Sequence, residues 1–450
     1  MIRRIIAYLS VAIAAFTPMI AHAGGLIRDA EVEYTLRAYA NPIFQSAGIP
    51  SEDIRILIVN DPAVNAFVAG GLNIFINTGL IRVTRNPGML IGVIAHETGH
   101  ISGAHLSQFS AKTNRALLGS AISAVLGAAA IAGGAGSAGA GIITGGQNIA
   151  MRNFFTEVRI NEQSADHAAL KFLDDNEISS AGVLEMFETL RRNESGAVSK
   201  RDPYLQTHPL TSERVATVRN HIKESTIPKN QVPSQFVPMH ARMVAKLAAF
   251  MESRDVIRKL YPESRKDIAA RYARAIADFR AAESKKAIAA MRQLIKEKPN
   301  DPFFQDTLGQ ILFETGDLNG ATTAYQRASV LLPDSALIMT DYAKTLIARD
   351  DPALLGRAIA LLERATALDD SNDFTWRQLA IAYGKRGDLG TSYAALAEEA
   401  ALQGDFETVL QHVKRARSHV QGESAIALQI DDLERDAREQ LIEQKKNSLF

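Results

Sequence analysis

The stretch Met89-Leu90-Ile91-Gly92-Val93-Ile94-Ala95-His96-Glu97-Thr98-Gly99-His100 decides the fold. Its first seven residues are apolar or small and predict a buried helix, which we expect to run from Pro87 to Leu106. Its last five residues place two histidines four positions apart. Because positions i and i+4 share one face of a helix, both imidazoles can reach one metal ion, and the Glu97 carboxylate can reach a water beside it. The pattern predicts a hydrolytic metal centre, and a hydrogen-bonded pair of core histidines is the alternative.

Such a centre needs a third protein ligand and an open position for water. Glu162 is the candidate, because it begins an amphipathic helix on which Asp166 follows one turn later. Glu162 would bind the metal while Asp166 accepts a hydrogen bond from a ligand histidine. The alternatives are that Glu162 is a surface residue or that Glu157 is the ligand. His105 misses the ligand position of an extended histidine motif by one residue.

The N-terminus has the features of an export signal. Arg3 and Arg4 precede an almost wholly apolar run over residues 5–20, and Ala21-His22-Ala23 fits a small-x-small cleavage site. We therefore expect a signal peptide over residues 1–23, cleavage after Ala23 and a periplasmic location. A membrane anchor is the alternative, although the apolar run is short for a spanning helix.

Composition restricts the chemistry further. The chain has no Cys among its 450 residues, which excludes disulfides and thiolate ligands and leaves His and carboxylate side chains to hold a metal. Without the expected signal peptide, 48 basic residues stand against 50 acidic ones, and this balance gives no reason to expect nucleic-acid binding. The length predicts two domains.

Residues 24–225 predict a mixed α and β domain. Ile54 to Asn60 and Leu72 to Asn77 have the composition of strands, and we expect the second of them to offer its backbone edge to extended substrate. Residues 116–151 carry no charge and are rich in Ala and Gly. This segment is expected to be a lid or a hairpin at a membrane surface, with a membrane span as the alternative.

Residues 226–240 contain three prolines and predict a linker, followed by a helical domain over residues 241–450. A repeat of 34 positions runs through that domain. Its matching small and large residues are Ala287, Met291, Leu294 and Pro299, then Ala321, Tyr325, Ala328 and Pro333. Ala358, Leu362 and Ala365 follow 37 positions later, which indicates a three-residue insertion at Asp351-Pro352-Ala353. These spacings predict a tetratricopeptide-repeat solenoid with a concave protein-binding face.

Three segments in chain order resemble the HtpX and CAAX-prenyl-endopeptidase type of zinc peptidase. They are His96 to His100, Glu162 with Ala165-Asp166, and Thr207-His208-Pro209. Two upstream segments, Asn65-Ala66-Phe67 and Asn77-Thr78-Gly79-Leu80, are similar as well. With an export signal and C-terminal repeats, the chain most resembles the periplasmic BepA-like branch of this family.

The resemblance implies a mainly helical α+β fold of the gluzincin type with a small β-sheet, followed by the repeat solenoid. It implies one zinc ion per chain on His96, His100 and Glu162, with Glu97 as the general base. It further implies that His208 either approaches the zinc and restrains activity or stabilises the oxyanion. A role for His208 in capping the turn before Pro209 is the alternative. Relatives can carry a disulfide in the repeat domain, which this chain cannot form.

Two functions follow from these expectations. The first is a periplasmic zinc endopeptidase that cleaves unfolded or misassembled outer-membrane proteins and binds clients or assembly machinery through its repeats. The second is a chaperone or assembly scaffold for outer-membrane proteins, in which proteolysis is secondary. Replacement of Glu97 by Gln separates the two, because it would abolish proteolysis and leave a scaffold intact.

Overall fold

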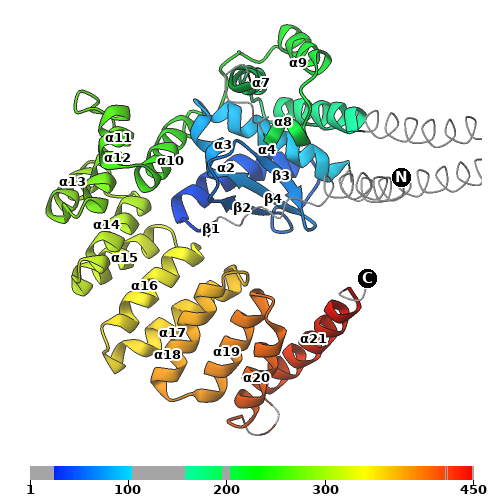
Figure 1. The fold of residues 1–450 in the computed structure, drawn as a ribbon. Helices are drawn as coiled ribbons and strands as arrows, with labels where there is room; N and C mark the ends of the chain where they lie inside the picture. Colours follow the sequence, from blue (N-terminus) through cyan, green and yellow to red (C-terminus); the bar gives the residue numbers. More distant parts are fainter. Residues whose placement is uncertain (1–24, 104–157, 195–202, 421, 423, 448–450) are drawn as a thin grey trace, which may run out of the picture. The chain divides into compact units, whose positions relative to one another are not determined.

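The computed structural model describes residues 25–103, 158–194, 203–420, 422 and 424–447. The expected signal peptide over residues 1–23 and the uncharged segment 116–151 lie outside the described residues. The chain divides into two compact units. The first comprises Val32–Leu247 and the residues up to Arg28, and the second comprises Asp29–Glu31 and Ala248–Phe450. Figure 1 labels their helices and strands.

The strands that the structure describes form one small sheet in the first unit, with the order β1-β2-β4-β3. Their bounds are Leu26–Ile27 for β1, Arg55–Val59 for β2, Ala66–Ala69 for β3 and Asn73–Asn77 for β4. Strands β2 and β4 are parallel, whereas β1 pairs with β2 and β3 pairs with β4 in antiparallel fashion. Strands β2 and β4 are the two strands expected from sequence.

Strand β3 was not expected, and it overturns one prediction. Because β4 is hydrogen-bonded to β2 on one side and to β3 on the other, it has no free edge for a substrate. Gly70 and Gly71 make the turn between β3 and β4 with φ angles of +60° and +93°, which side chains with a Cβ rarely adopt. This three-residue turn, Gly70 to Leu72, folds Ala66–Ala69 back onto β4, and β3 therefore forms that edge of the sheet.

The helices of the first unit surround α4, which carries the two histidines. Their bounds are Ala30–Ser46 for α2, Thr78–Val83 for α3, Pro87–Ser102 for α4, residues 158–175 for a helix called the Glu162 helix below, Ala181–Glu194 for α7, Pro203–Thr207 for α8 and Ser212–Glu224 for α9. Helix α4 begins where the Asn86 side chain accepts a hydrogen bond from Met89 N, with Pro87 in the first turn.

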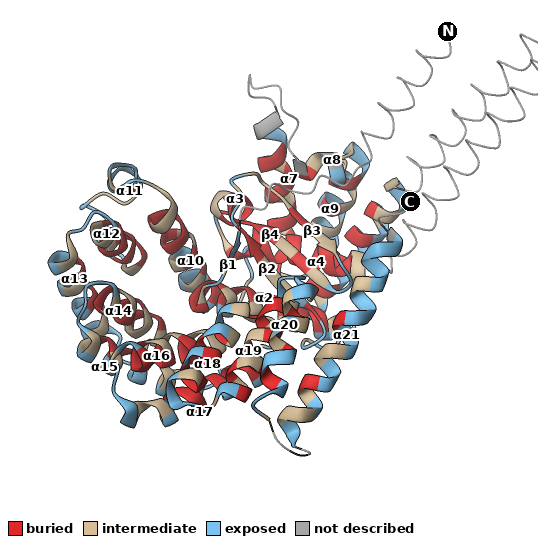
Figure 2. Ribbon diagram, turned by 60° about the horizontal axis from the view of Figure 1, so that its bottom comes forward, coloured by how far each residue is buried: buried red, intermediate tan, exposed pale blue. Residues whose placement is uncertain are grey.

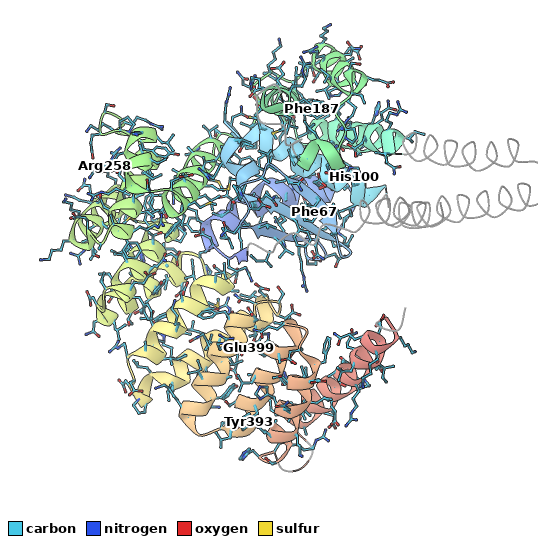
Figure 3. The ribbon with its side chains drawn as sticks, viewed as in Figure 1. Phe67, His100, Phe187, Arg258, Tyr393 and Glu399 are labelled. Carbon is cyan, nitrogen blue, oxygen red and sulfur yellow. The ribbon has the colours of Figure 1, made fainter. Side chains whose placement is uncertain are left out.

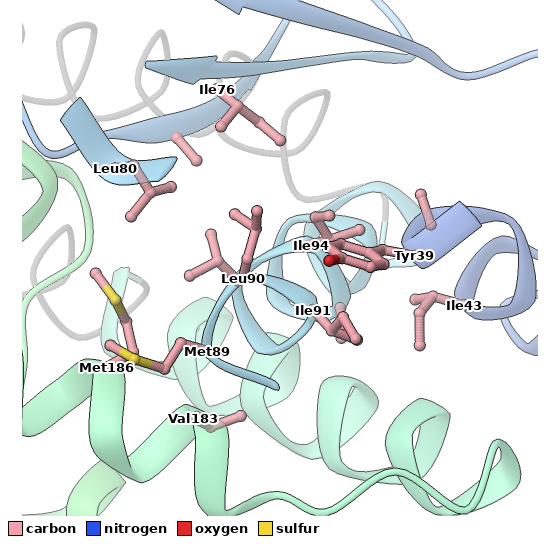
Figure 4. Close-up of a cluster of buried hydrophobic side chains, with 14 of the residues drawn as sticks. Tyr39, Ile43, Ile76, Leu80, Met89, Leu90, Ile91, Ile94, Val183 and Met186 are labelled. Atoms are coloured by element: carbon pink, nitrogen blue, oxygen red, sulfur yellow. The ribbon is translucent and has the colours of Figure 1, made fainter. Parts of the chain in front are cut away.

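Every residue of α4 from Pro87 to Gly99 is buried (Figure 2). Figure 4 shows Leu90, Ile91 and Ile94 of α4 between Ile76 of the sheet and Tyr39 of α2. Burial of an aliphatic side chain stabilises a fold by about 1.5–3 kcal/mol, so this helix is a main source of the unit's stability. It also fixes the metal-site histidines on a rigid element.

Two glycines let neighbouring helices approach α4 closely. A Cβ on Gly92 would lie 2.7 Å from the Val183 side chain of α7. A Cβ on Gly99 would lie 2.7 Å from the backbone oxygen of Ala165 in the Glu162 helix. Real Cβ atoms do not come this close to other heavy atoms, so only glycine allows these two contacts.

The boundary between the units falls after Leu247, inside α10 (Phe236–Met251). The last five residues of the Pro-containing segment 226–240 are therefore helical. Pro238 lies in the first turn of α10, where a helix tolerates proline because the missing N–H would have no partner within the helix. Residues 225–235 lie outside the helices, as the prolines indicate.

The second unit consists of helices packed in sequential pairs, which confirms the expected helical repeat. Their bounds are Arg254–Leu260 for α11, Ile268–Arg280 for α12, Ser284–Glu297 for α13, Pro302–Glu314 for α14, Leu318–Leu331 for α15, Ala336–Ala348 for α16, Pro352–Leu368 for α17, Asp373–Arg386 for α18, Leu389–Leu402 for α19, Phe406–Arg417 for α20 and Ala425–Asn447 for α21. A Cβ on Gly309 of α14 would lie 2.9 Å from the Tyr325 ring of α15. This contact explains the pairing of a small with a large residue in the repeat.

The three-residue insertion lengthens one helix of the repeat. Helix α17 has 17 residues, whereas α15, the corresponding helix of the preceding pair, has 14. Asp351 caps α17 by accepting a hydrogen bond from Ala353 N, so the inserted residues form its first turn. Among the described residues, no helix is long and apolar enough to cross a membrane.

Candidate metal centre

Helix α4 presents His96 and His100 on the same face, as their spacing predicts. The two Nε2 atoms lie 3.1 Å apart, and the rings meet edge to face with centroids 4.7 Å apart. Figure 3 shows His100 on α4. Two imidazole nitrogens this close can serve one ion.

The Glu162 helix brings its carboxylates to these rings. Glu162 Oε1 lies 3.3 Å from His100 Nε2, and Glu162 Oε2 lies 3.5 Å from His96 Nε2. On the other side of the His96 ring, Asp166 Oδ1 lies 3.0 Å from Nδ1. The close contact between Gly99 and Ala165 holds the two helices at the separation that these distances require.

His208 completes the cluster from the end of α8. Its Nδ1 lies 3.1 Å from Glu162 Oε1 and 3.3 Å from His96 Nε2. Ligand atoms of His96, His100, Glu162 and His208 all lie within 4.8 Å of one another, and these residues form the one possible metal-binding group among the residues that the structure describes. These donors suit zinc or another divalent transition metal, since imidazole and carboxylate are usual ligands of such ions.

Glu97 lies beside the cluster and does not join it. Its side chain is 1% exposed, and neither carboxylate oxygen has a hydrogen-bond partner among the described residues. His208 is a neighbour of this carboxylate, with its Nε2 3.6 Å from Glu97 Oε1. Burial raises the pKa of Glu97, and the neighbouring His208 and His96 only partly offset this. A buried carboxylate without partners is costly, so its environment fits a metal ion with a water molecule in reach of Glu97.

The ligand side chains differ in their electrostatics. Burial would raise the pKa of Glu162, but His208, His100 and His96 together hold it well below its ordinary value. Burial lowers the pKa of His100 to about 3. Burial also acts to lower the pKa of His96, but Asp166 and Glu162 outweigh it and raise that pKa to about 9. Binding of a metal must therefore displace a proton from His96 near neutral pH.

Comparison with known proteins supports the assignment of this cluster to a peptidase. Residues 27–222 match the model of peptidase family M48. This part of the chain is therefore similar to peptidase family M48, and residues 27–222 are called the M48 domain below. The M48 domain contains all six residues that the sequence suggested for the site. Residues 277–402 match the model described as the TPR domain of cytochrome c-type biogenesis protein H.

Two relatives align with this chain over most of their length. The chain is 24% identical over 398 residues to the beta-barrel assembly-enhancing protease of Yersinia pestis, an alignment that covers 88% of this chain and 81% of the relative. It is also 24% identical over 404 residues to the protein of the same name from Escherichia coli strain K12, with 88% and 80% covered.

The M48 domain also contains Arg214, a site residue that the sequence reasoning missed. Arg214 donates from Nε to Asp166 Oδ2 at 2.6 Å and from Nη2 to Asp166 Oδ1 at 2.8 Å. Its Nη1 donates to Glu162 Oε2 at 2.7 Å and to the backbone oxygen of Pro209 at 3.0 Å. Although burial acts to raise the pKa of Asp166, Arg214 and His96 lower it to about 2. The Arg214 guanidinium thus joins the carboxylates of Asp166 and Glu162 to Pro209, the residue that follows His208.

A signal for Arg214 was present in the sequence. Arg214, Val215 and Val218 form the buried face of the amphipathic helix α9. An arginine on the apolar face of a helix requires buried carboxylate partners, and Glu162 with Asp166 formed the only such predicted pair. The guanidinium also lies over the ring of Phe187 of α7, 5.2 Å from its centroid.

Tyr204 is a second residue that the sequence reasoning missed. Its ring lies against that of His208 with centroids 4.6 Å apart, and its backbone oxygen accepts a hydrogen bond from His208 N at 2.7 Å. Because Tyr204 belongs to the buried core of the M48 domain, it supports His208 from a rigid position. Nothing in the local sequence distinguishes this tyrosine from an ordinary core residue.

Proposed function

We propose that this chain is a periplasmic zinc endopeptidase that hydrolyses unfolded or misassembled outer-membrane proteins. The observation that carries the proposal is the group of four ligand residues beside the buried, unpartnered carboxylate of Glu97. The names of the relatives support the client class, since both are beta-barrel assembly-enhancing proteases. The expected signal peptide over residues 1–23 supports the location.

In this proposal His96, His100 and Glu162 hold the zinc ion, and Asp166 orients His96 through its Nδ1. When bound, zinc supplies Lewis-acid polarisation of the scissile carbonyl and makes a nearby water easier to deprotonate. Glu97 takes the proton of the attacking water and delivers it to the leaving amine. The raised pKa of Glu97, which follows from its burial, suits a group that must both accept and return a proton.

His208 has two roles in the proposal, according to its position. In the described position its Nδ1 lies among the other ligand atoms, where it would take the place of water or substrate and restrain the enzyme. Displaced by substrate, its Nε2 would face the developing oxyanion near Glu97.

Extended substrate is proposed to pair with the free edge of β3 rather than with β4. Strand β3 lies next to α4, and its outer edge has no strand partner among the described residues. Main-chain pairing along an edge strand requires an extended segment, which a folded client does not offer. The enzyme would therefore select unfolded chains.

The repeats in the second unit support a further role in binding clients or assembly machinery. They make up a large part of the chain and match a TPR model over residues 277–402. A chaperone or assembly scaffold with secondary proteolysis is thus the second candidate function. A peripheral membrane contact through residues 116–151 is part of the same proposal.

The test measures zinc content and cleavage of an unfolded model protein by the mature chain and by its Glu97→Gln variant. We expect about one zinc ion in each. The variant should lose about 10²–10⁴-fold in rate, because it keeps the ligands and loses the base. Zinc without cleavage in the wild-type chain would favour the scaffold, and a chain that binds no zinc would contradict the proposal.

A further inference from the structure

Helices α20 and α21 line an open cleft of about 460 Å³ in the second unit. Its lining residues are Leu410, Val413, Lys414, Arg417, Ser418, Glu434 and Arg438. The cleft lies beyond residues 277–402, which match the TPR model, and shares no residue with the metal centre. Its volume is in the range of sites that bind small ligands or one or two side chains of a partner.

The cleft combines an aliphatic floor with a cationic rim. Val413 is buried and Leu410 half-buried, and both belong to or pack on the hydrophobic cluster of these helices. Lys414, Arg417 and Arg438 contribute three positive charges, against one negative charge from Glu434 in the lining and a second from Asp431, which pairs with Arg417. A ligand that fits both parts must have a small apolar group with an anionic group directly beside it.

The two arginines are held in place before any ligand binds. Arg417 Nη2 donates to Glu434 Oε2 at 2.7 Å, and Arg438 Nη2 donates to Glu434 Oε1 at 2.5 Å. Asp431 holds the Arg417 guanidinium as well, with 2.5 Å between Nη2 and Oδ1. Side chains fixed in this way lose less entropy when they bind an anion. Lys414, in contrast, has no ion pair with any residue that the structure describes, so its charge is available.

We propose that this cleft binds the C-terminal residue of a polypeptide, with its carboxylate at Lys414 and Arg438 and its apolar side chain on Leu410 and Val413. A free C-terminus places a carboxylate and a side chain on the same carbon atom, as the closeness of rim and floor requires. The chemistry argues against a lipid, because two floor residues would leave most of an acyl chain in water.

The experiment uses the full chain and a fluorescent pentapeptide that ends in Leu, as the free acid and as the C-terminal amide. We expect the acid to bind at least about tenfold more tightly than the amide, since only the acid carries the charge that the rim complements. The affinity of the acid should fall as salt is added, because the rim is exposed to solvent. A peptide that ends in Asp should bind more weakly than one that ends in Leu.

Variants assign the binding to the cleft. Lys414→Gln and Arg438→Gln should each weaken binding of the acid about tenfold. Arg435→Gln is the matched control, because Arg435 lies on α21 and pairs with Asp432 outside the cleft. The affinity of the Arg435→Gln variant for the free-acid peptide should match that of the wild-type chain.

Equal affinities for acid and amide would overturn the proposal, as would binding that both cleft variants leave unchanged. Binding to vesicles of anionic lipid without binding to the peptide would overturn it in favour of a membrane contact. Cleavage by the metal centre is measured separately, so the loss of one activity does not affect the interpretation of the other.

Discussion

Arg214 donates two parallel hydrogen bonds to the Asp166 carboxylate beside the metal centre, at 2.6 and 2.8 Å. The pair is buried, and a third hydrogen bond extends it to Glu162. Buried ion pairs contribute little net stability compared with apolar residues, but removal of one partner leaves the other charge uncompensated. The position of the proposed ligand Glu162 therefore depends on a residue of α9.

Replacement of Arg214 by Met should weaken metal binding about 10–100-fold, because Asp166 and Glu162 lose the donor that orients them. The free energy of unfolding of the first unit should fall by about 3–5 kcal/mol. Metal content after dialysis against a chelator measures the first effect, and amide hydrogen exchange in α4 measures the second. Arg219→Gln is the control, since Arg219 is an exposed residue of the same helix. Full metal retention in Arg214→Met would contradict a positioning role.

Gly99→Ala should separate α4 from the Glu162 helix. The added methyl group would lie 2.7 Å from the backbone oxygen of Ala165, so one helix must shift. We expect a loss of about 1–3 kcal/mol in the free energy of unfolding together with weaker metal binding. Gly356→Ala is the matched control, because a Cβ there meets no atom within 4 Å and should be neutral or slightly stabilising. A fully stable, metal-loaded Gly99→Ala variant would show that the close contact is not required.

His208→Ala should raise the rate of cleavage of an unfolded substrate. In the described position His208 lies among the proposed ligands, and its removal opens a position for water and substrate. If nine molecules in ten have His208 at the metal, its removal raises the rate about tenfold. Initial rates per bound zinc test this, with His221→Gln as a control because His221 pairs with Asp174 and is not one of the four ligand residues. A rate that falls instead would assign His208 to oxyanion stabilisation.

His240 should make the first unit less stable in mild acid. Burial lowers its pKa to about 4, although a hydrogen bond to the Thr84 backbone oxygen acts in the opposite direction. The unfolded chain, with an ordinary pKa near 6.5, takes up a proton between pH 6.5 and 4 that the folded chain does not, so stability is full above pH 6.5 and falls as the pH drops towards 4. Between pH 7.5 and pH 5 this amounts to about 2 kcal/mol.

Hydrogen exchange of β4 and α4 amides at the two pH values measures this loss in the wild-type chain. In the His240→Gln variant the loss in the free energy of unfolding between these pH values should be smaller by about 2 kcal/mol, since glutamine does not titrate. An identical pH dependence in both chains would exclude His240 as the cause.

The sequence predicted those parts of the fold and the site that local patterns determine. The spacing of His96 and His100 on one helix, and of Glu162 and Asp166 on another, follows from the period of the α-helix. The repeat likewise follows from matched residues 34 positions apart. The roles assigned to these side chains remain predictions.

The remaining features depend on partners that are distant in the chain. The ion pair of Arg214 with Asp166 joins residues 48 positions apart, and α9 by itself does not identify the partner of its buried arginine. Strand β3 has four residues, two of them Ala, and it forms because it pairs with β4 across Gly70-Gly71. Without β3, β4 appeared to have a free edge, which explains the wrong prediction of the substrate-binding strand.

His96 and His208 are 112 positions apart in the chain, so the donor cluster forms late in the synthesis of the first unit. A newly made polypeptide that ends before α8 lacks both His208 and Arg214, and one that ends between α8 and α9 lacks Arg214 alone. The complete donor cluster therefore arises only after the whole first unit has been synthesised and folded. An unfinished chain without α9 therefore lacks the guanidinium that positions Asp166 and Glu162, so its metal site is not yet held in place.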